Sequence, residues 1–351
     1  MLDVPEAADQ HDTAAVIAAA FARAIATARV HEGATAPNPA VGCVLLDAAG
    51  TILIVAGHPG AGQPHAEARA IQLAREAGVA DRIHTVIVTL EPCNHQGRTG
   101  PCATAILTTP AAEVWYALPD PNPLAAGGAA ALTRSGLRVM PLAHLHHSDT
   151  PHLLVEAARL LAPFATRVRL GRPFVTVKQA VDGRGSMIPP PGQKTFTGPE
   201  ALTLAHQLRR RADAVLTGSG TVLADRPEFT VRHVPDIPGK SRILCILDRR
   251  GRVDSGYLAE ATARGFRPMI AADLATALRD LALEGCNEVL VEAGPAVTEA
   301  VRVAGLWDEW VLIEKVMPGQ RDRITISAAP MGESASIDRT RSGTKSSGTE
   351  S

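Results

Sequence analysis

Apolar residues in the first part of the chain alternate between helix and strand periods. The run from Asp12 to Val30 is rich in helix formers, so we expect a helix that starts at an N-cap on Asp12. The segments that follow predict paired strands over 41–46 and 51–55, a helix over 65–77, a buried strand over 85–90 and a helix over about 101–107. This order is typical of a layered α/β unit, expected over residues 12–150.

A second alternation begins after a less regular stretch. Between Pro141 and Arg172 the chain holds several histidines, a short helical run over 153–161 and then Pro163, so we expect a domain boundary there. The later pattern predicts strands over 174–177, 214–217, 243–247 and 288–291 and helices over 199–211 and 296–304. It indicates a second α/β domain over 172–317. Residues 318–351 turn to Ser, Thr, Gly and charge, which predicts a disordered tail.

Composition limits the classes of protein that the chain can belong to. Its 351 residues suggest two domains, and 35 Lys and Arg against 36 Asp and Glu provide no broad basic surface for a nucleic acid. Five cysteines, an odd number, do not suggest a disulfide framework. The first residues lack a signal-peptide pattern, and no uninterrupted apolar run is long enough to cross a bilayer. We therefore expect a soluble, cytoplasmic protein with neither nucleic-acid nor membrane partners.

The sharpest chemical signal is a histidine and two cysteines at the ends of predicted elements. His65 opens a helix, Cys93 follows a buried strand and Cys102 opens the next helix. One imidazole and two thiolates suit a catalytic zinc ion that keeps its fourth position for water. Glu67, two residues after the histidine, is placed to pass protons from that water to a leaving group. The set predicts hydrolytic deamination.

Simpler readings exist for these residues. Taken singly, a His or a free Cys is more often a core residue than a ligand, and we expect that of Cys43 in its predicted strand. The joint layout of His-x-Glu and Pro-Cys is, however, that of zinc nucleobase deaminases, although eight residues rather than two separate the cysteines. A second cluster, His144, His146 and His147, lacks a Cys or carboxylate at ligand spacing, so we do not expect it to bind metal.

Longer strings resemble a known family. The segments PNPAVG (37–42), HAE (65–67), TLEPCNHQGRTGPC (89–102) and DPNP (120–123) are similar to those of the bifunctional riboflavin-biosynthesis enzymes, in which a pyrimidine deaminase is fused to a reductase. The resemblance extends through most of both halves. It implies a cytidine-deaminase-like three-layer α/β/α domain followed by a dihydrofolate-reductase-like α/β domain.

The resemblance also implies ligands and roles in the first half. The family's substrate is 2,5-diamino-6-ribosylamino-4(3H)-pyrimidinone 5′-phosphate, a small pyrimidine ribotide. Zinc would be held by His65, Cys93 and Cys102, with Glu67 as the catalytic proton shuttle. The residues implied around the substrate are Asn38, His58, His95 and Arg98, the last as a donor to the phosphate. The simpler alternatives are a turn for Asn38, a strand end for His58 and a solvated loop charge for Arg98.

In the second half the resemblance rests on two glycine-containing segments. TGSGTVLAD (217–225), continuing to TVR (230–232), and VEAGP (291–295) are similar to the family's NADPH-dependent reductase, which converts the ribosyl group to ribityl to give 5-amino-6-(5-phosphoribitylamino)uracil. Small residues after a strand let backbone approach a cofactor, and a helix N-terminus suits a pyrophosphate. The residues implied for the cofactor are Thr221, Asp225, Gly294 and Pro295. Those implied for the substrate are Arg232 and Glu292.

This half also departs from the family pattern. Residues 178–184 (KQAVDGR) are two residues short, QKTFT stands at 193–197, the stretch between Arg232 and Glu292 looks compressed, and no closing strands are evident after residue 313. An alternative is therefore a deaminase with a degenerate second domain that serves structure or oligomerisation. A nucleic-acid-editing deaminase and a non-catalytic metal-binding module are further alternatives, the former disfavoured by the near-zero charge and few aromatics. The resemblance suggests a homodimer through the reductase-like domain.

Overall fold

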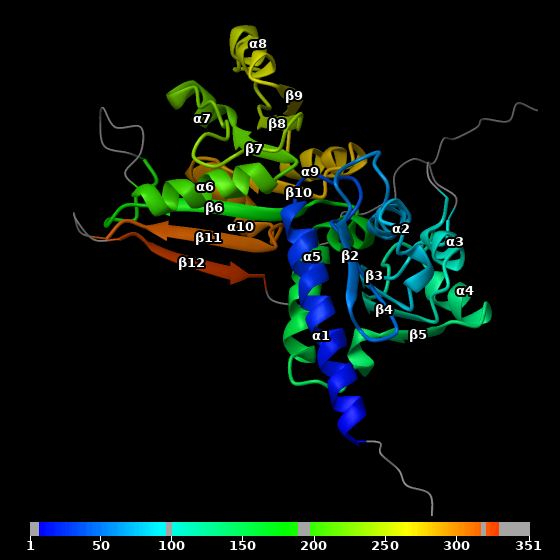
Figure 1. The fold of residues 1–351 in the computed structure, drawn as a ribbon. Helices are drawn as coiled ribbons and strands as arrows, with labels where there is room; N and C mark the ends of the chain where they lie inside the picture. The colour runs from blue at the N-terminus through cyan, green and yellow to red at the C-terminus, as the bar shows by residue number, and fades with distance from the viewer. Residues whose placement is uncertain (1–6, 96–99, 189–196, 317–320, 330–351) are drawn as a thin grey trace, which may run out of the picture.

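The computed structural model describes residues 7–95, 100–188, 197–316 and 321–329. Two β-sheets, one in each half of the chain, organise it (Figure 1). The first is five-stranded, in the order β2-β1-β3-β4-β5, and the second is seven-stranded, in the order β12-β11-β6-β10-β7-β8-β9. Both are covered by helices, which confirms the expected α/β class for each half.

The first sheet is mixed. Its strands are β1 (Gly42–Leu46), β2 (Ile52–Gly57), β3 (Thr85–Leu90), β4 (Glu113–Leu118) and β5 (Arg138–Pro141). β1 pairs antiparallel with both β2 and β3, whereas β3, β4 and β5 run parallel. Every residue of β1 and β3 is buried because helices lie on both faces of the sheet.

Alternate residues of β1 serve two separate cores. Cys43 and Leu45 pack toward α2 (Ala66–Glu76), α3 (Cys102–Leu107) and α4 (Gly128–Arg134). Val44 and Leu46 pack toward α1 (Ala7–Val30) and α5 (Thr150–Leu170) on the opposite face. The period-two pattern of one strand therefore produces the three-layer α/β/α arrangement. Cys43 is fully buried, as expected for a core residue.

Helix α1 begins earlier than the sequence suggests. It starts at Ala7, so Asp12 lies inside the helix and the predicted N-cap there is wrong. Residues 7–11 include helix-favouring Ala and Gln, which extend the helix past that position. Among the described residues α1 alone is long and apolar enough to span a membrane by length and composition. Its apolar face instead packs on the first sheet, where Phe21 and Ala24 are fully buried.

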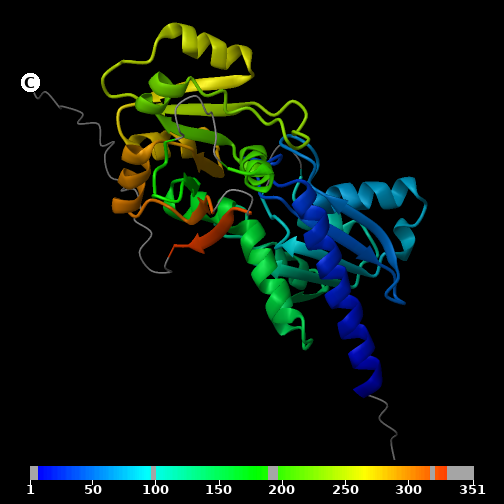
Figure 2. The same ribbon diagram turned by 90° about the vertical axis from the view of Figure 1, so that its left-hand side faces the viewer.

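Helix α5 connects the halves and lies beside α1 (Figure 2). It runs unbroken through Pro163, so the predicted end near residue 161 is wrong. A proline inside a helix loses one backbone hydrogen bond, but burial of Leu160, Leu161 and Phe164 on either side of it supports the continuous helix. The helix ends at Gly171, which takes the left-handed conformation at φ 68°.

The second sheet is parallel except at one edge. Its strands are β6 (Phe174–Val181), β7 (Ala214–Gly218), β8 (Arg242–Leu247), β9 (Phe266–Ala271), β10 (Glu288–Val291), β11 (Glu309–Glu314) and β12 (Arg323–Ala328). Helices α9 (Leu274–Leu283) and α10 (Pro295–Val303) cover one face. Helices α6 (Pro199–Arg211), α7 (Ser219–Asp225) and α8 (Ser255–Ala263) cover the other. The short 3-10 turns Ala80–Arg82 and Leu142–His144 lie in the first half.

The interval between Arg232 and Glu292 holds two strand–helix units, β8-α8 and β9-α9, followed by β10. The expectation that no closing strand follows residue 313 is wrong: β12 pairs antiparallel with β11, which in turn pairs with β6. β12 lies within 318–351, so the part of that range over 321–329 is not a disordered tail. All six residues of β12 are exposed, and such a strand gives only a weak signal in the sequence. The strand is ordered because it pairs with β11.

Candidate functional site

The predicted zinc ligands meet at the ends of three elements. His65 caps α2, Cys93 follows β3 after a short link, and Cys102 is the first residue of α3. The His65 Nδ1 atom lies 3.7 Å from the Sγ of Cys93 and 3.4 Å from the Sγ of Cys102. Their candidate ligand atoms all lie within 4.8 Å of one another, and no other such cluster occurs among the described residues.

This donor set fits zinc. An imidazole and two thiolates provide three ligands of a tetrahedral site with one open position. The backbone N–H of Cys102 donates to the Sγ of Cys93 over 3.3 Å, at the N-terminus of α3, a location that favours a thiolate. Hydrogen bonding to Cys102 and His65 lowers the pKa of Cys93 to about 4. Zinc and deaminase chemistry therefore agree with the residues present.

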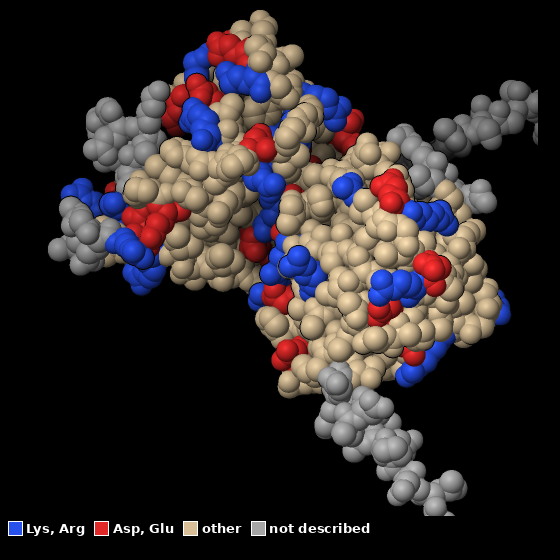
Figure 3. Space-filling model, in the orientation of Figure 1, with Lys and Arg blue, Asp and Glu red and all other residues tan. Residues whose placement is uncertain are grey.

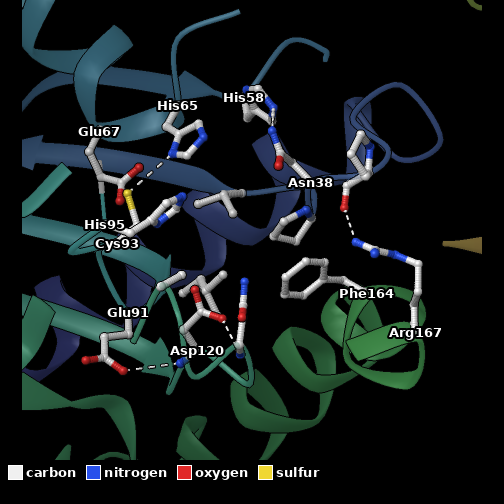
Figure 4. Close-up of a pocket in the computed structure, with 16 residues that line it drawn as sticks. Asn38, His58, His65, Glu67, Glu91, Cys93, His95, Asp120, Phe164 and Arg167 are labelled. Carbon is white, nitrogen blue, oxygen red and sulfur yellow. Dashed lines mark hydrogen bonds between the residues drawn. The ribbon is translucent and has the colours of Figure 1, made fainter. Parts of the chain in front are cut away.

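Glu67 lies in the first turn of α2 next to this cluster (Figure 4). Its side chain is buried, and burial, helped by the nearby Cys93, raises its pKa to about 7. A carboxyl group with such a pKa can both accept and donate a proton at neutral pH. The arrangement supports the predicted proton shuttle beside the zinc ligands.

A pocket of about 260 Å³ opens over the cluster. Its walls include the predicted Asn38, His58 and His95 together with His65, Glu67 and Cys93 (Figure 4). Three predicted substrate residues thus share one cavity with the zinc ligands. The fourth, Arg98, lies outside the described residues.

His58 is held in a defined orientation. Its Nδ1 atom lies 3.0 Å from the backbone oxygen of Pro64, so it donates there. That tautomer leaves Nε2 as an acceptor for the Nδ2 group of Asn38, which lies 3.4 Å away. Burial lowers the pKa of His58, which favours the neutral ring. The pair presents a fixed polar wall to the pocket.

Sequence reasoning gave no site role to several other residues of the pocket. Glu91 accepts backbone hydrogen bonds from Asp120, Gly127 and Ala129 over 3.0–3.2 Å and thereby anchors the 120–129 segment. Asp120 and Asn122 also line the pocket, and the DPNP string (120–123) was the sequence signal that could have identified them. Phe164 and Arg167 also line the pocket, from α5 and beyond the expected 12–150 range. No local motif marks them, because only the packing of α5 brings them there.

The second half gathers its candidate residues at the carboxyl ends of parallel strands. Glu292 directly follows β10, and Lys178 lies in the neighbouring β6. The buried Glu292 carboxylate accepts a hydrogen bond from Lys178 Nζ over 2.8 Å. It accepts two more from Arg209, from Nε over 2.5 Å and from Nη2 over 3.0 Å. Although burial opposes ionisation, these cations hold the pKa of Glu292 at about 2. Glu292 is therefore a charged residue enclosed by protein cations.

Three of the predicted cofactor residues meet at the start of α10. The Gly294 N–H donates to Thr221 Oγ1 over 2.9 Å, and Pro295, which has no N–H, is the first residue of the helix. The next N–H groups, those of Ala296 and Val297, have no partner within the helix, so they suit a dinucleotide pyrophosphate at the carboxyl edge of a parallel sheet. These residues fit the NADPH implied for a reductase.

The remaining predicted residues of this half lie on the surface. Asp225 is exposed at the C-terminal end of α7. The side chain of Arg232, also exposed, pairs with Glu228, while its backbone N–H donates to His206 Nδ1 over 2.9 Å. A second cavity, of about 370 Å³, lies beside Pro295 and is bounded by Gln179, Met187 and Trp310. Of the predicted residues of this half, Pro295 alone lines it.

Comparisons with known proteins agree with both sites. A family model described as the cytidine and deoxycytidylate deaminase zinc-binding region matches residues 16–118, and one described as the RibD C-terminal domain matches residues 173–315. The riboflavin biosynthesis protein RibD of Corynebacterium ammoniagenes is 33% identical over 97% of this chain and 99% of its own length.

Solved structures give the same result. Acinetobacter baumannii RibD, form 1, is similar with a TM-score of 0.73 and 32% identity, over 88% of this chain and 90% of that one. A diaminohydroxyphosphoribosylaminopyrimidine deaminase/5-amino-6-(5-phosphoribosylamino)uracil reductase from Thermotoga maritima has a TM-score of 0.73 and 28% identity, over the same shares. The match to a reductase domain disfavours the alternative of a deaminase alone.

Proposed function

The chain belongs to the RibD family of bifunctional riboflavin-biosynthesis enzymes, and from that premise we propose which of its residues carry out the two reactions and on which substrate. The activities are a zinc-dependent deamination and an NADPH-dependent reduction. We infer that the first belongs to residues 12–150 and the α5 residues of the pocket. The second belongs to residues 172–317 with β12. The single observation that carries the proposal is the shared pocket of zinc ligands, Glu67 and Asn38.

The proposed substrate of the first step is 2,5-diamino-6-ribosylamino-4(3H)-pyrimidinone 5′-phosphate. The bond between a ring carbon and its exocyclic amino group breaks, a C–O bond forms from water at that carbon, and ammonia leaves. When bound, zinc supplies Lewis-acid chemistry that makes water nucleophilic at neutral pH. Glu67 takes a proton from that water on a carboxylate oxygen and returns it to the departing nitrogen. Its raised pKa suits both transfers.

The walls of the pocket would bind the pyrimidine. Asn38 offers its amide and His58 its neutral ring from one side, and His95 lies at the exposed rim. In the full chain Arg98 would meet the phosphate. Phe164 supplies an apolar surface against which a ring can pack.

In the second half the residues act around a bound nucleotide. Gly294 and Pro295 at the start of α10, with Thr221 bonded to Gly294, would hold NADPH, which supplies a hydride when bound. Asp225 and Arg232 are proposed at the edge of this region. Glu292 would serve the ribotide through Lys178 of β6, whose ammonium group it orients. The second product is 5-amino-6-(5-phosphoribitylamino)uracil.

The other proposed properties concern partners and location. We propose a small-molecule substrate, no nucleic-acid partner, a cytoplasmic location and a homodimer through the reductase half. On the face shown in Figure 3, basic and acidic side chains are interspersed among the described residues. All five cysteines are buried and free, as suits a reducing compartment. The edge strand β12 exposes Ile324 and Ile326, which supports a dimer interface at this edge of the second sheet.

Product analysis tests the proposal. Purified, zinc-loaded protein is incubated with the diaminopyrimidinone ribotide, with and without NADPH, and the products are identified by mass spectrometry. We expect loss of ammonia in both samples and a further reduction only with NADPH. Deamination without reduction would refute the proposed reductase site, and no reaction in a zinc-containing sample would refute the whole assignment.

A further inference from the structure

The two halves of the chain meet at the loop that carries Asn38. This loop walls the deaminase pocket through Pro37, Asn38 and Pro39, although it belongs to none of the helices or strands. Its own bonds are few: the Asn38 N–H donates to the Thr35 oxygen over 2.9 Å, and the Thr35 hydroxyl donates to the Asn38 oxygen over 3.0 Å. Its position therefore depends on what packs behind it.

Asn287, from the reductase half, packs behind this loop. It lies immediately before β10 and is buried. Its Nδ2 group donates to the backbone oxygen of Asn38 over 3.0 Å, and its Oδ1 atom accepts from the Nε of Arg167 over 2.7 Å. Both polar ends of one side chain are thus used across the boundary between the halves.

Arg167 completes the arrangement. Its Nη2 group donates to the backbone oxygen of Pro37 over 2.7 Å (Figure 4). Two successive carbonyl groups, those of Pro37 and Asn38, are therefore held by two side chains that also bond to each other. Fixing both peptide planes around Asn38 fixes the direction of its side chain, whose Nδ2 group lies 3.4 Å from His58 Nε2 inside the pocket.

The backbone packing at the same boundary is equally close. A Cβ atom at Gly33 would lie 2.5 Å from the Arg211 backbone oxygen, and one at Gly285 would lie 3.1 Å from the Pro37 side chain. Only glycine permits this approach from both sides of the boundary. At these two points the loop is in direct contact with the reductase half.

We propose that Asn287 is a positioning residue for deamination and that the reductase half thereby holds one wall of the deaminase pocket in place. Asn287 and Arg167 together hold the Pro37–Asn38 backbone so that the Asn38 amide faces the substrate. The proposal rests on the proposed role of Asn38 in binding the pyrimidine. By this proposal, a residue of the second half contributes to substrate binding in the first half through the backbone of Asn38.

Substitution of Asn287 in the full-length enzyme tests this. Asn287→Leu keeps a similar size but removes both hydrogen bonds, and we expect the KM for deamination to rise about tenfold, the effect of roughly one net hydrogen bond. The kcat should change much less, and zinc content and reductase turnover should be unchanged. Asn287→Asp keeps an acceptor for Arg167 but loses the donor to Asn38, so its KM should also rise.

Glu284→Gln is the matched control. Glu284 is exposed, borders the cavity between the halves and pairs with Arg267, but makes no hydrogen bond to Pro37 or Asn38. Its KM should equal that of the unmodified enzyme. Normal reductase turnover in each variant shows that the second half is folded, so a change in deaminase KM is not a folding defect.

A double variant separates the possible failures. If Asn287 acts through Asn38, adding Asn287→Leu to Asn38→Ala should raise KM no further than Asn38→Ala alone. A KM unchanged in Asn287→Leu but raised in Asn38→Ala would overturn the inference and leave the proposed function standing. An unchanged KM in Asn38→Ala would overturn the proposed role of Asn38 itself, and the inference with it.

Discussion

The deaminase site and the reductase site are assembled from the chain in different ways. The zinc ligands and Glu67 all lie between His65 and Cys102, at the ends of elements that follow one another. The buried group in the second half joins Lys178, Arg209 and Glu292, each from a different and distant element. The polar side chains of the first site are available to bind a metal ion. In the second group the Glu292 carboxylate and the cations Lys178 and Arg209 neutralise one another inside the protein.

Because of this difference, we expect substitutions at the two sites to affect different properties of the protein. His65, Glu67 and Cys93 line the deaminase pocket, so a change in one of them acts directly on the groups that would meet metal and substrate. A change in the second group leaves a charge buried without its partner, which is costly for folding. We therefore expect variants in the first half to lose activity and variants in the second to lose stability.

The largest effect should follow Glu67→Gln. Loss of the proton shuttle should lower the kcat for deamination about 10²- to 10⁴-fold, with zinc and reductase turnover retained. Steady-state kinetics and metal analysis measure this. Glu76→Gln is the control: Glu76 lies on the same helix, is exposed, accepts a hydrogen bond from Gln72, and its variant should be fully active. Turnover retained by Glu67→Gln would exclude it as the shuttle.

Glu292→Gln should destabilise the reductase half by about 3–5 kcal/mol, because Lys178 and Arg209 lose their buried counter-charge. Urea unfolding followed in parallel with deaminase turnover measures the loss. Glu299→Gln removes an exposed carboxylate that pairs with Arg302 and should leave the stability almost unchanged. Equal losses in the two variants would show that the buried group carries no special stability.

The same carboxylate predicts an acid dependence. Its pKa is about 2 in the folded protein against 4.5 for an unperturbed Glu. Because the folded pKa is the lower one, the stabilisation is complete above about pH 4.5 and is lost as the pH falls toward 2, a change of about 3 kcal/mol. Urea unfolding at a series of acidic pH values measures it. Over this interval Glu292→Gln should lose less stability than the unmodified enzyme, and parallel curves would refute the assignment.

The smallest effect concerns the boundary that joins the two regions. Gly33 and Gly62 both have positive φ, 79° and 78°, but only Gly33 faces the other half, whereas Gly62 has open space around it. Each Gly→Ala change should cost about 1–2 kcal/mol for its conformation. Gly33→Ala should cost about 1–3 kcal/mol more because its Cβ meets the Arg211 oxygen. Equal thermal unfolding midpoints would mean that the halves do not press together there.

Much of the first half could be predicted because its signals are local. The continuous apolar runs of β1 and β3, which are buried throughout, and the helix starts at His65 and Cys102 are visible in the order of residues. The metal set was predictable for the same reason: each ligand marks the end of an element. The path of α5 through Pro163 was not, because tertiary burial overrides the local tendency of proline to end a helix.

The sequence by itself determined the α/β class and the alternation of elements, and it predicted the proposed zinc ligands and Glu67, since these follow from spacing along the chain. Only the tertiary structure decided that Phe164 and Arg167 line the deaminase pocket and that Glu292 is enclosed by Lys178 and Arg209. It alone placed Asn287 against the loop of Asn38. The physical reason is that packing joins side chains from distant segments, and no short-range pattern records which distant segments will touch.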